Sequence, residues 1–381
     1  MRWQRSRAGR KADCSGRCGP AGACYADFME TREDRTFYLL DGLRGVAAIA
    51  VMVYHAAALF VPVRLPGSYL AVDLFFMLSG FVLTHAYADR LAEGLSWRAF
   101  LVARLVRLYP LYIAGTMFGV LVVTAVLIAG MGHLDALGWS SRVVAALAML
   151  PSPALGRGGT ELCPLNVPAW SLFFELAVNI WFAVALSRIE TRVLAVGVGV
   201  AAIVFALVIL AHGSANVGWQ WSSFLSGIAR VTFSFWAGVL IYRLRIRGKL
   251  AVPFASAIPL LLIPLFLLDM APRAWLDIGL TMIVFPAIII GSAAVIVGPV
   301  SERLCAMLGR TSFAIYAIHY PILSLAILAL AHIHLNTAGF VPLFGISLLF
   351  VIGVAAYWLD RYYDPPARRA LARLLAPASK P

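Results

Sequence analysis

The stretch LLDGLRGVAAIAVMVYHAAALF, residues 39–60, is apolar enough in its middle to cross a membrane, yet it contains Asp41, Arg44 and His55. Because lipid offers the backbone no water, a segment of this composition spans a bilayer as a helix. Ionisable side chains within such a helix are costly and mark functional positions. The stretch therefore predicts a membrane helix that borders a polar site.

The rest of the chain has the same character. Of its 381 residues, 62% are hydrophobic and 13% charged, whereas soluble domains have about 25% charged residues. We predict an all-α polytopic membrane protein, a bundle of about ten transmembrane helices, because apolar runs of roughly 18 or more residues recur throughout. A shorter run at 141–150 predicts a surface or re-entrant helix. The predicted spans are residues 42–61, 70–88, 109–130, 168–187, 193–212, 223–243, 250–268, 275–297, 312–332 and 339–359.

The chain has a formal net charge of +13, and its basic residues are distributed as expected for a membrane topology. Basic residues gather on alternate loops and at the carboxyl end, which predicts that both termini are cytoplasmic. This pattern accounts for the basic excess without a nucleic-acid partner. We assign residues 38–360 to a membrane domain and residues 361–381 to a basic cytoplasmic tail.

Residues 1–37 predict a disordered basic extension, and translation from Met29 is an alternative start. Cys14, Cys18 and Cys24 lie within it, but they lack a CxxC pair and a fourth ligand. No metal site is therefore predicted.

Helical geometry aligns the ionisable residues of the opening stretch. Arg44 and His55 are eleven positions apart, which is within about 20° of three full turns. Asp41 falls near the same stripe. We therefore expect an Asp41–Arg44 pair at the inner end of the helix and an imidazole roughly 16 Å further out.

Two carboxylates are candidates to orient His55 as a general base. Asp73 and Glu175 both belong to predicted spans and are expected near the level of His55. The sequence does not choose between them. Ser171 shares a helical face with Glu175, and Trp170 is expected to wall the site.

Basic residues predict a second kind of site on the inner side. Arg104 and Arg107 share one helical face just before the third predicted span, an arrangement that suits phosphate or pyrophosphate. The alternative is that they only set topology. Arg230 lies well inside a span and should face a carboxylate or ligand. His319 is a candidate for a supporting role, with a structural role as the alternative.

Five motifs occur in the order found in one known family. Together they resemble the acyltransferase-3 family of integral membrane acyltransferases over roughly residues 36–360. The motifs are LDGLRGVAAIAVMVYH (40–55), VDLFFMLSGFVL (72–83), RLVRLYP (104–110), VPAWSLFFEL (167–176) and RTSFAIYAIHYPIL (310–323).

The resemblance implies an O-acyltransferase in a bacterial inner membrane. Such an enzyme takes an acyl group, commonly acetyl, from cytoplasmic acyl-coenzyme A and passes it to a sugar hydroxyl of an extracytoplasmic polysaccharide or glycolipid. Its partners would be membrane lipid, acyl-coenzyme A and the glycan acceptor. By resemblance, the essential arginine and histidine correspond to Arg44 and His55, the RxxR pair to Arg104 and Arg107, and the tryptophan-serine and glutamate motif to Trp170, Ser171 and Glu175.

Several alternatives stay open. An enzyme of the same family acting on a small-molecule metabolite fits the motifs, and a transporter or flippase of a lipid-linked sugar would use Arg230, Asp73 and Glu175 as its path. Transfer is either direct, with His55 as general base, or passes through an acyl group on His55. For Arg44 we favour donor binding over oxyanion stabilisation, because it lies at the inner end of its helix.

Overall fold

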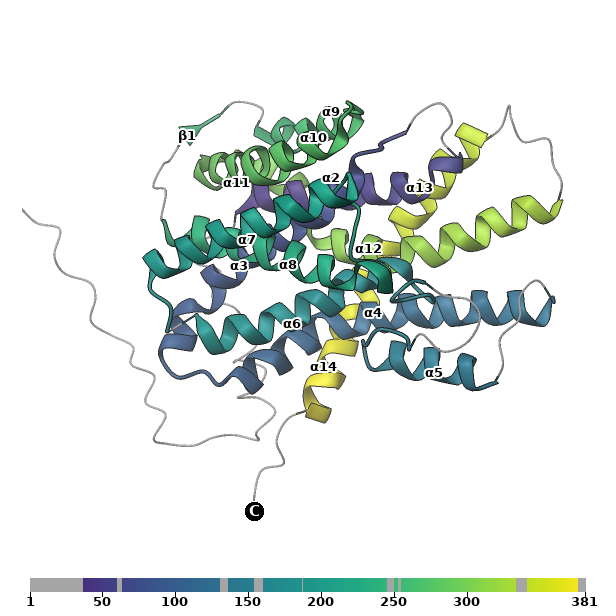
Figure 1. Cartoon of the computed structure of the whole chain (residues 1–381). Coiled ribbons are helices and arrows are strands. Elements are labelled where there is room, and N and C mark those ends of the chain that lie inside the picture. The colour runs from purple at the N-terminus through teal and green to yellow at the C-terminus, as the bar shows by residue number, and fades with distance from the viewer. Residues whose placement is uncertain are drawn as a thin grey trace, which may run out of the picture.

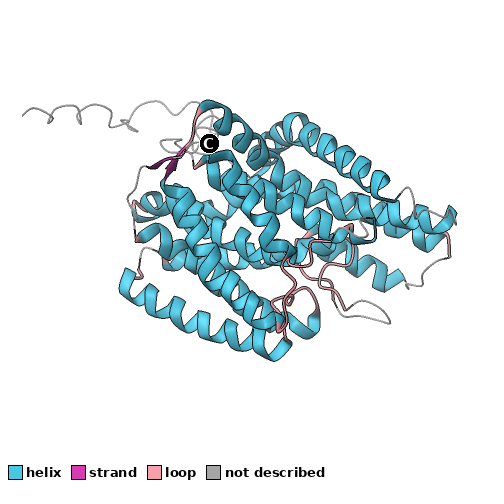
Figure 2. Ribbon diagram, turned by 90° about the horizontal axis from the view of Figure 1, so that it is seen from above, coloured by secondary structure: helices cyan, strands magenta, loops and turns pink. Residues whose placement is uncertain are grey.

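The computed structural model describes residues 37–59, 64–130, 136–153, 160–186, 188–244, 250–252, 255–333 and 341–375. These residues are almost entirely helical, as Figures 1 and 2 show, which confirms the predicted all-α class. Residues 1–36, with Met29 and the three cysteines of the predicted extension, lie outside the described residues.

The helices follow one another with short connections. A π-helical turn, Leu280–Val284, joins α10 (Arg273–Gly279) to α11 (Phe285–Ala294). Another, Leu359–Tyr363, joins α13 (Val341–Trp358) to α14 (Asp364–Leu375). The strands β1 (Leu250–Ala251) and β2 (Val295–Ile296) pair in parallel, with Leu250 opposite Val295. The helices are α2 (Tyr38–His55), α3 (Ala71–Ala92), α4 (Trp97–Ile128), α5 (Ala136–Leu147), α6 (Trp170–Ala185), α7 (Thr191–His212), α8 (Phe224–Arg243), α9 (Leu262–Leu267), α10 (Arg273–Gly279), α11 (Phe285–Ala294), α12 (Pro299–Ile333), α13 (Val341–Trp358) and α14 (Asp364–Leu375).

The described residues contain eight helices long and apolar enough to cross a membrane, so the chain is a multi-pass membrane protein. Two of the ten predicted spans are not among these eight. The 18-residue helix α2 carries three ionisable side chains. The predicted span 250–268 is corrected, since residues 250–251 form β1 and the apolar helix covers only Ala255–Leu267. Pro259 and Pro264 lie in this short helix and lack the N–H that a regular helix needs.

Helix α4 begins earlier than the predicted start at residue 109. Ser96 caps it, because its hydroxyl accepts a hydrogen bond from the Ala99 N–H. Arg104 and Arg107 consequently lie inside a membrane-length helix and not in front of one. Within the predicted basic tail, residues 364–375 form α14, which packs against α4 (Figure 1).

Glycines let the central helices approach closely. A Cβ atom on Gly45 of α2 would lie 2.4 Å from the Leu308 side chain of α12, and one on Gly80 of α3 would lie 2.0 Å from the Phe235 carbonyl of α8. Small residues at such crossings allow tight backbone packing in membranes. The α2–α12 and α3–α8 pairs are the most extensive helix contacts of the fold.

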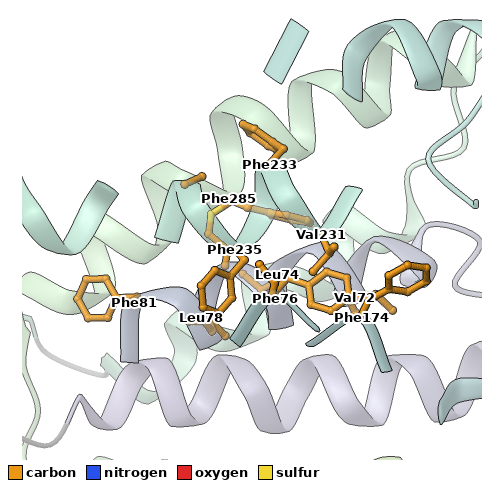
Figure 3. Close-up of a cluster of buried hydrophobic side chains, with 14 of the residues drawn as sticks. Val72, Leu74, Phe76, Leu78, Phe81, Phe174, Val231, Phe233, Phe235 and Phe285 are labelled. Carbon is orange, nitrogen blue, oxygen red and sulfur yellow. The ribbon is translucent and has the colours of Figure 1, made fainter. Parts of the chain in front are cut away.

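A buried apolar cluster fixes α3 against its neighbours (Figure 3). Helices α3, α6, α8 and α11 all contribute to it. The burial of these apolar side chains holds α3 in place. This helix carries Asp73 and Ser79, two polar residues of the sites described below. The labelled members are Val72, Leu74, Phe76, Leu78 and Phe81 of α3, Phe174 of α6, Val231, Phe233 and Phe235 of α8, and Phe285 of α11.

Candidate active site

A cavity of about 200 Å³ lies between α2, α3, α4, α6 and α12. The predicted donor-site arginines and part of the predicted catalytic motif line this one cavity, although they come from three different helices. Phe75, Phe76 and Phe313 form part of its apolar wall. The polar lining consists of Arg44, Ser79, Arg104, Arg107, Ser171, Glu175, Ser312 and Tyr316.

An ion pair joins two walls of the cavity. Arg104 Nη2 on α4 lies 2.8 Å from Glu175 Oε1 on α6, and the Ser79 hydroxyl on α3 donates to the same oxygen at 2.9 Å. The side chains of Arg104 and Glu175 are only 13% and 17% exposed. Arg104 Nε is buried and has no hydrogen-bond partner among the described residues. This guanidinium therefore keeps a donor for an incoming anion.

The two other arginines of the cavity are held by aspartates outside it. Arg44 Nη1 lies 3.3 Å from Asp41 Oδ1, which confirms the predicted pair within one helix. Arg107 Nη1 lies 3.6 Å from Asp364 Oδ2 of α14. With Glu175 as the only carboxylate among the residues lining the cavity, the three arginines make it a positively charged site suited to phosphate oxygens.

His55 pairs with His319. His55 is the last residue of α2, and its Nδ1 lies 3.1 Å from Nε2 of His319 on α12 and 3.0 Å from the Val51 carbonyl oxygen. The His319 side chain is fully buried. Tyr54 and Tyr320 pack edge-on against the His55 ring, with centroid separations of 5.4 and 5.3 Å. The structure thus joins residues 264 positions apart into one imidazole pair.

Tyr316 connects the cavity to this pair. Its ring lines the cavity, and its hydroxyl lies 2.7 Å from the Ser171 hydroxyl and donates to the Pro168 carbonyl. Its own carbonyl oxygen contacts His319 Nδ1 at 3.0 Å, one helical turn further along α12. The cavity therefore reaches from the arginines on one side to within one turn of the histidine pair on the other.

Asp73 belongs to a separate buried network. Arg230 donates from Nε and Nη2 to the Asp73 carboxylate at 2.7–3.1 Å, and from Nη1 and Nη2 to the carbonyls of Val217 and Tyr69. Ser234 donates to Asp73 as well. This confirms that Arg230 faces the bundle interior beside a carboxylate. All three guanidinium nitrogens are used within the protein, so the network holds helices together.

Trp170 supports this network and not the cavity. The Arg230 guanidinium lies 5.5 Å from the centroid of the Trp170 ring, in cation–π geometry. Trp170 is buried and is not among the cavity-lining residues, in contrast to the expectation that it walls the site. Its neighbour Ser171 does line the cavity together with Glu175, as their shared helical face predicts.

The expectation that a carboxylate orients His55 is not met. Asp73 is bound to Arg230, Glu175 is bound to Arg104, and in the described part of the chain no carboxylate hydrogen-bonds to His55. Matching helical depths placed these residues at one level, but depth alone does not say which helices are neighbours. The neighbour of His55 comes from α12.

Sequence reasoning missed several residues of the site. Ser79 and Tyr316 both lie inside motifs that were already singled out, so the motifs themselves carried a signal for them. Asp364 had none, since nothing in the basic carboxyl-terminal segment indicates that it packs against α4. Asn166 donates to the Ala317 carbonyl at 2.9 Å. That carbonyl lacks its usual helical partner because Pro321, four residues later, has no N–H.

Comparison with known proteins identifies the class. The chain matches the acyltransferase-3 family, described as an acyltransferase domain, over residues 37–359, and it belongs to this family. It is therefore an acyltransferase of the membrane. It is also 41% identical over 166 residues to a Rhizobium radiobacter protein described as protein 2 in the picA locus, an alignment that covers 41% of this chain and 85% of the relative. No solved structure matches the chain.

Proposed function

We propose that the protein is a membrane O-acyltransferase that moves an acyl group, commonly acetyl, from cytoplasmic acyl-coenzyme A to a sugar hydroxyl of a polysaccharide or glycolipid outside the cytoplasm of a bacterial cell. The observation that carries the proposal is the cavity that extends from Arg44, Arg104 and Arg107 to Tyr316, which lies one helical turn from His319, the hydrogen-bond partner of His55. Family membership supports acyl transfer. The donor, the acceptor and the direction of transfer are the proposed part.

The arginine end of the cavity suits the phosphates of coenzyme A. Guanidinium groups bind phosphate oxygens in bidentate fashion, and the buried Arg104 Nε has no partner among the described residues. Arg44 and His55 are about 16 Å apart along α2, by the rise per residue of an α-helix. A donor anchored at the arginines would extend its acyl thioester along the cavity toward Tyr316.

At the histidine end, the acceptor hydroxyl attacks the thioester carbonyl. A new C–O bond forms, the C–S bond breaks, and His55 takes the hydroxyl proton and returns it to the departing thiolate sulfur. A positioned histidine contributes typically 10²–10⁴-fold in rate to such a step. In the alternative path, His55 takes the acyl group first and releases it to the acceptor.

The test is thiol release from acetyl-coenzyme A by purified protein in lipid, with and without a cell-envelope glycan extract. We expect glycan-stimulated release by the wild type and none by His55→Ala. His212→Ala is a matched control, because His212 also ends a helix and its Nδ1 also lies 3.0 Å from the carbonyl four residues earlier. Absence of release from any acyl donor by folded wild-type protein would overturn the proposal and favour a transporter.

A further inference from the structure

The hydrogen-bond partners of His319 determine which of its nitrogens carries a proton. Its Nδ1 lies 3.0 Å from the carbonyl oxygens of Ile315 and Tyr316. Carbonyl oxygens only accept hydrogen bonds, so Nδ1 must be the donor. The ring is fully buried, and among the described residues no carboxylate hydrogen-bonds to it. A buried imidazolium without a counter-charge is costly, so we assign a neutral ring with a lone pair on Nε2.

The same reasoning then assigns His55. Its Nδ1 faces two acceptors, the Nε2 lone pair of His319 at 3.1 Å and the Val51 carbonyl at 3.0 Å. His55 Nδ1 therefore carries the proton and donates to them. The neutral His55 ring is left with its lone pair on Nε2, the nitrogen that faces neither His319 nor the backbone.

We propose that His319 is a positioning residue that holds His55 in the Nδ1–H tautomer, so that Nε2 of His55 is the nitrogen that reacts with the acceptor. The inference rests on the function proposed above and adds the reacting atom and its support. When His55 Nε2 takes the hydroxyl proton, its ring becomes an imidazolium. Its Nδ1–H continues to donate to the His319 lone pair, which stabilises that positive charge until the proton passes to the thiolate.

A need for backbone capping does not explain the His319 contacts. Within α12, Ile315 and Tyr316 can accept from the N–H groups of residues 319 and 320 in the regular helical pattern. The carbonyl that Pro321 leaves without a partner is that of Ala317, and Asn166 satisfies it. The Nδ1 contacts of His319 therefore serve to aim its Nε2 at His55.

A neutral partner also suits the surroundings. A carboxylate in this position would need its own cation to offset burial, as Asp73 needs Arg230 elsewhere in the bundle. The titratable rings that pack against the pair are those of Tyr54, Tyr316 and Tyr320. An imidazole supplies the required acceptor without adding charge to this part of the bundle.

Two variants test the role in catalysis. His319→Phe keeps a ring but removes the acceptor, whereas His319→Gln retains an oxygen acceptor for the His55 Nδ1–H. We expect His319→Phe to lower kcat by about 100-fold or more, with the KM for acetyl-coenzyme A unchanged, and His319→Gln to recover a large part of kcat. Equal kcat values for wild type and His319→Phe would overturn the inference. An equal loss of kcat in His319→Phe and His319→Gln would also overturn the inference. That result is expected if His319 only packs against its neighbours.

A second readout does not depend on activity. In protein labelled with ¹⁵N-histidine and reconstituted in lipid, nuclear magnetic resonance distinguishes protonated from unprotonated ring nitrogens, and the His55→Ala and His319→Phe variants assign the two signals. We expect a protonated Nδ1 and an unprotonated Nε2 on His55 in the wild type, and a weaker preference in His319→Phe, where only the Val51 carbonyl still accepts from Nδ1. A wild-type His55 protonated on Nε2 overturns the inference, whereas a wild type without acyl transfer overturns the proposed function itself.

Discussion

Arg104 and Glu175 form an ion pair across the candidate active site, with Nη2 and Oε1 2.8 Å apart. Because the Ser79 hydroxyl donates to the same carboxylate oxygen, the pair links α3, α4 and α6. Glu175 lies against the arginine wall and not beside His55. This position favours a role for Glu175 in orienting Arg104 toward the donor.

The Glu175→Gln variant tests that role. The amide keeps an oxygen for Ser79 but removes the charge that holds Arg104, so we expect the KM for acyl-coenzyme A to rise by about ten-fold while kcat changes little. Steady-state thiol release measures both quantities. Glu190→Gln, at an exposed glutamate before α7, is the control. A large fall in kcat at unchanged KM would instead support the catalytic role that the sequence predicts for Glu175.

Arg104→Ala and Arg107→Ala should each weaken binding of acyl-coenzyme A. We expect a rise in Kd of roughly ten-fold or more for Arg104→Ala, because a charge-assisted hydrogen bond is worth about 1.5–3 kcal/mol. The effect of Arg107→Ala should be smaller, because the Arg107 side chain is 37% exposed and forms an ion pair with Asp364. Calorimetric titration of the protein in detergent measures both values. Arg188→Ala is the control, because Arg188 is an exposed arginine after α6. If the affinity for acyl-coenzyme A is unchanged in all three variants, Arg104 and Arg107 serve only to set the membrane topology.

Variants of the Asp73–Arg230 pair distinguish a structural from a catalytic role for Asp73. Arg230→Met alone leaves a buried carboxylate without its cation and should lower the free energy of unfolding by about 3–5 kcal/mol. Adding Asp73→Leu removes that charge, so the double variant should be more stable than the single one. Thermal unfolding in detergent gives the stabilities. A stable double variant that releases thiol normally would exclude Asp73 as a catalytic residue, and a stable but inactive one would support the sequence-based prediction.

The glycine crossing of α3 and α8 predicts a packing effect. A Cβ atom at Gly80 would lie 2.0 Å from the Phe235 backbone carbonyl, so Gly80→Ala must push the helices apart and should cost about 1–3 kcal/mol. Gly197→Ala on α7 is the matched control, because no atom lies within 4 Å of a Cβ there. That substitution should be neutral or stabilise the protein by up to about 1 kcal/mol through helix propensity. Equal unfolding temperatures for the two variants would contradict the close crossing.

Local sequence was sufficient for the helices and for several of their faces. Apolar runs are read directly from composition, because the bilayer demands them whatever the neighbours are. The short helix predicted at 141–150 is observed at Ala136–Leu147. The Asp41–Arg44 pair and the shared face of Ser171 and Glu175 likewise depend only on neighbouring residues along one helix. The inward orientation of Arg230 also followed from the cost of exposing a guanidinium to lipid.

Helix boundaries were less predictable. The start of α4 at Trp97 and the continuation of α13 into α14 involve polar and basic residues that an apolar-run criterion places outside the predicted spans. Packing of α14 against α4 and the Arg107–Asp364 contact stabilise the helix within the predicted tail, and neither contact is visible in composition. The predicted cytoplasmic location of both termini stays a prediction.

The sequence by itself determined a helical membrane protein with ionisable residues at costly positions, because hydropathy and helical periodicity are local properties. Only the tertiary structure decided which of these residues meet. His55 meets His319 and not a carboxylate, Glu175 meets Arg104, and Asp73 meets Arg230. For residues at equal depth on different helices, the sequence does not show which are neighbours. Their pairing depends on which helices pack together. In this fold that packing follows from shape, through the glycines that let α2 approach α12 and α3 approach α8.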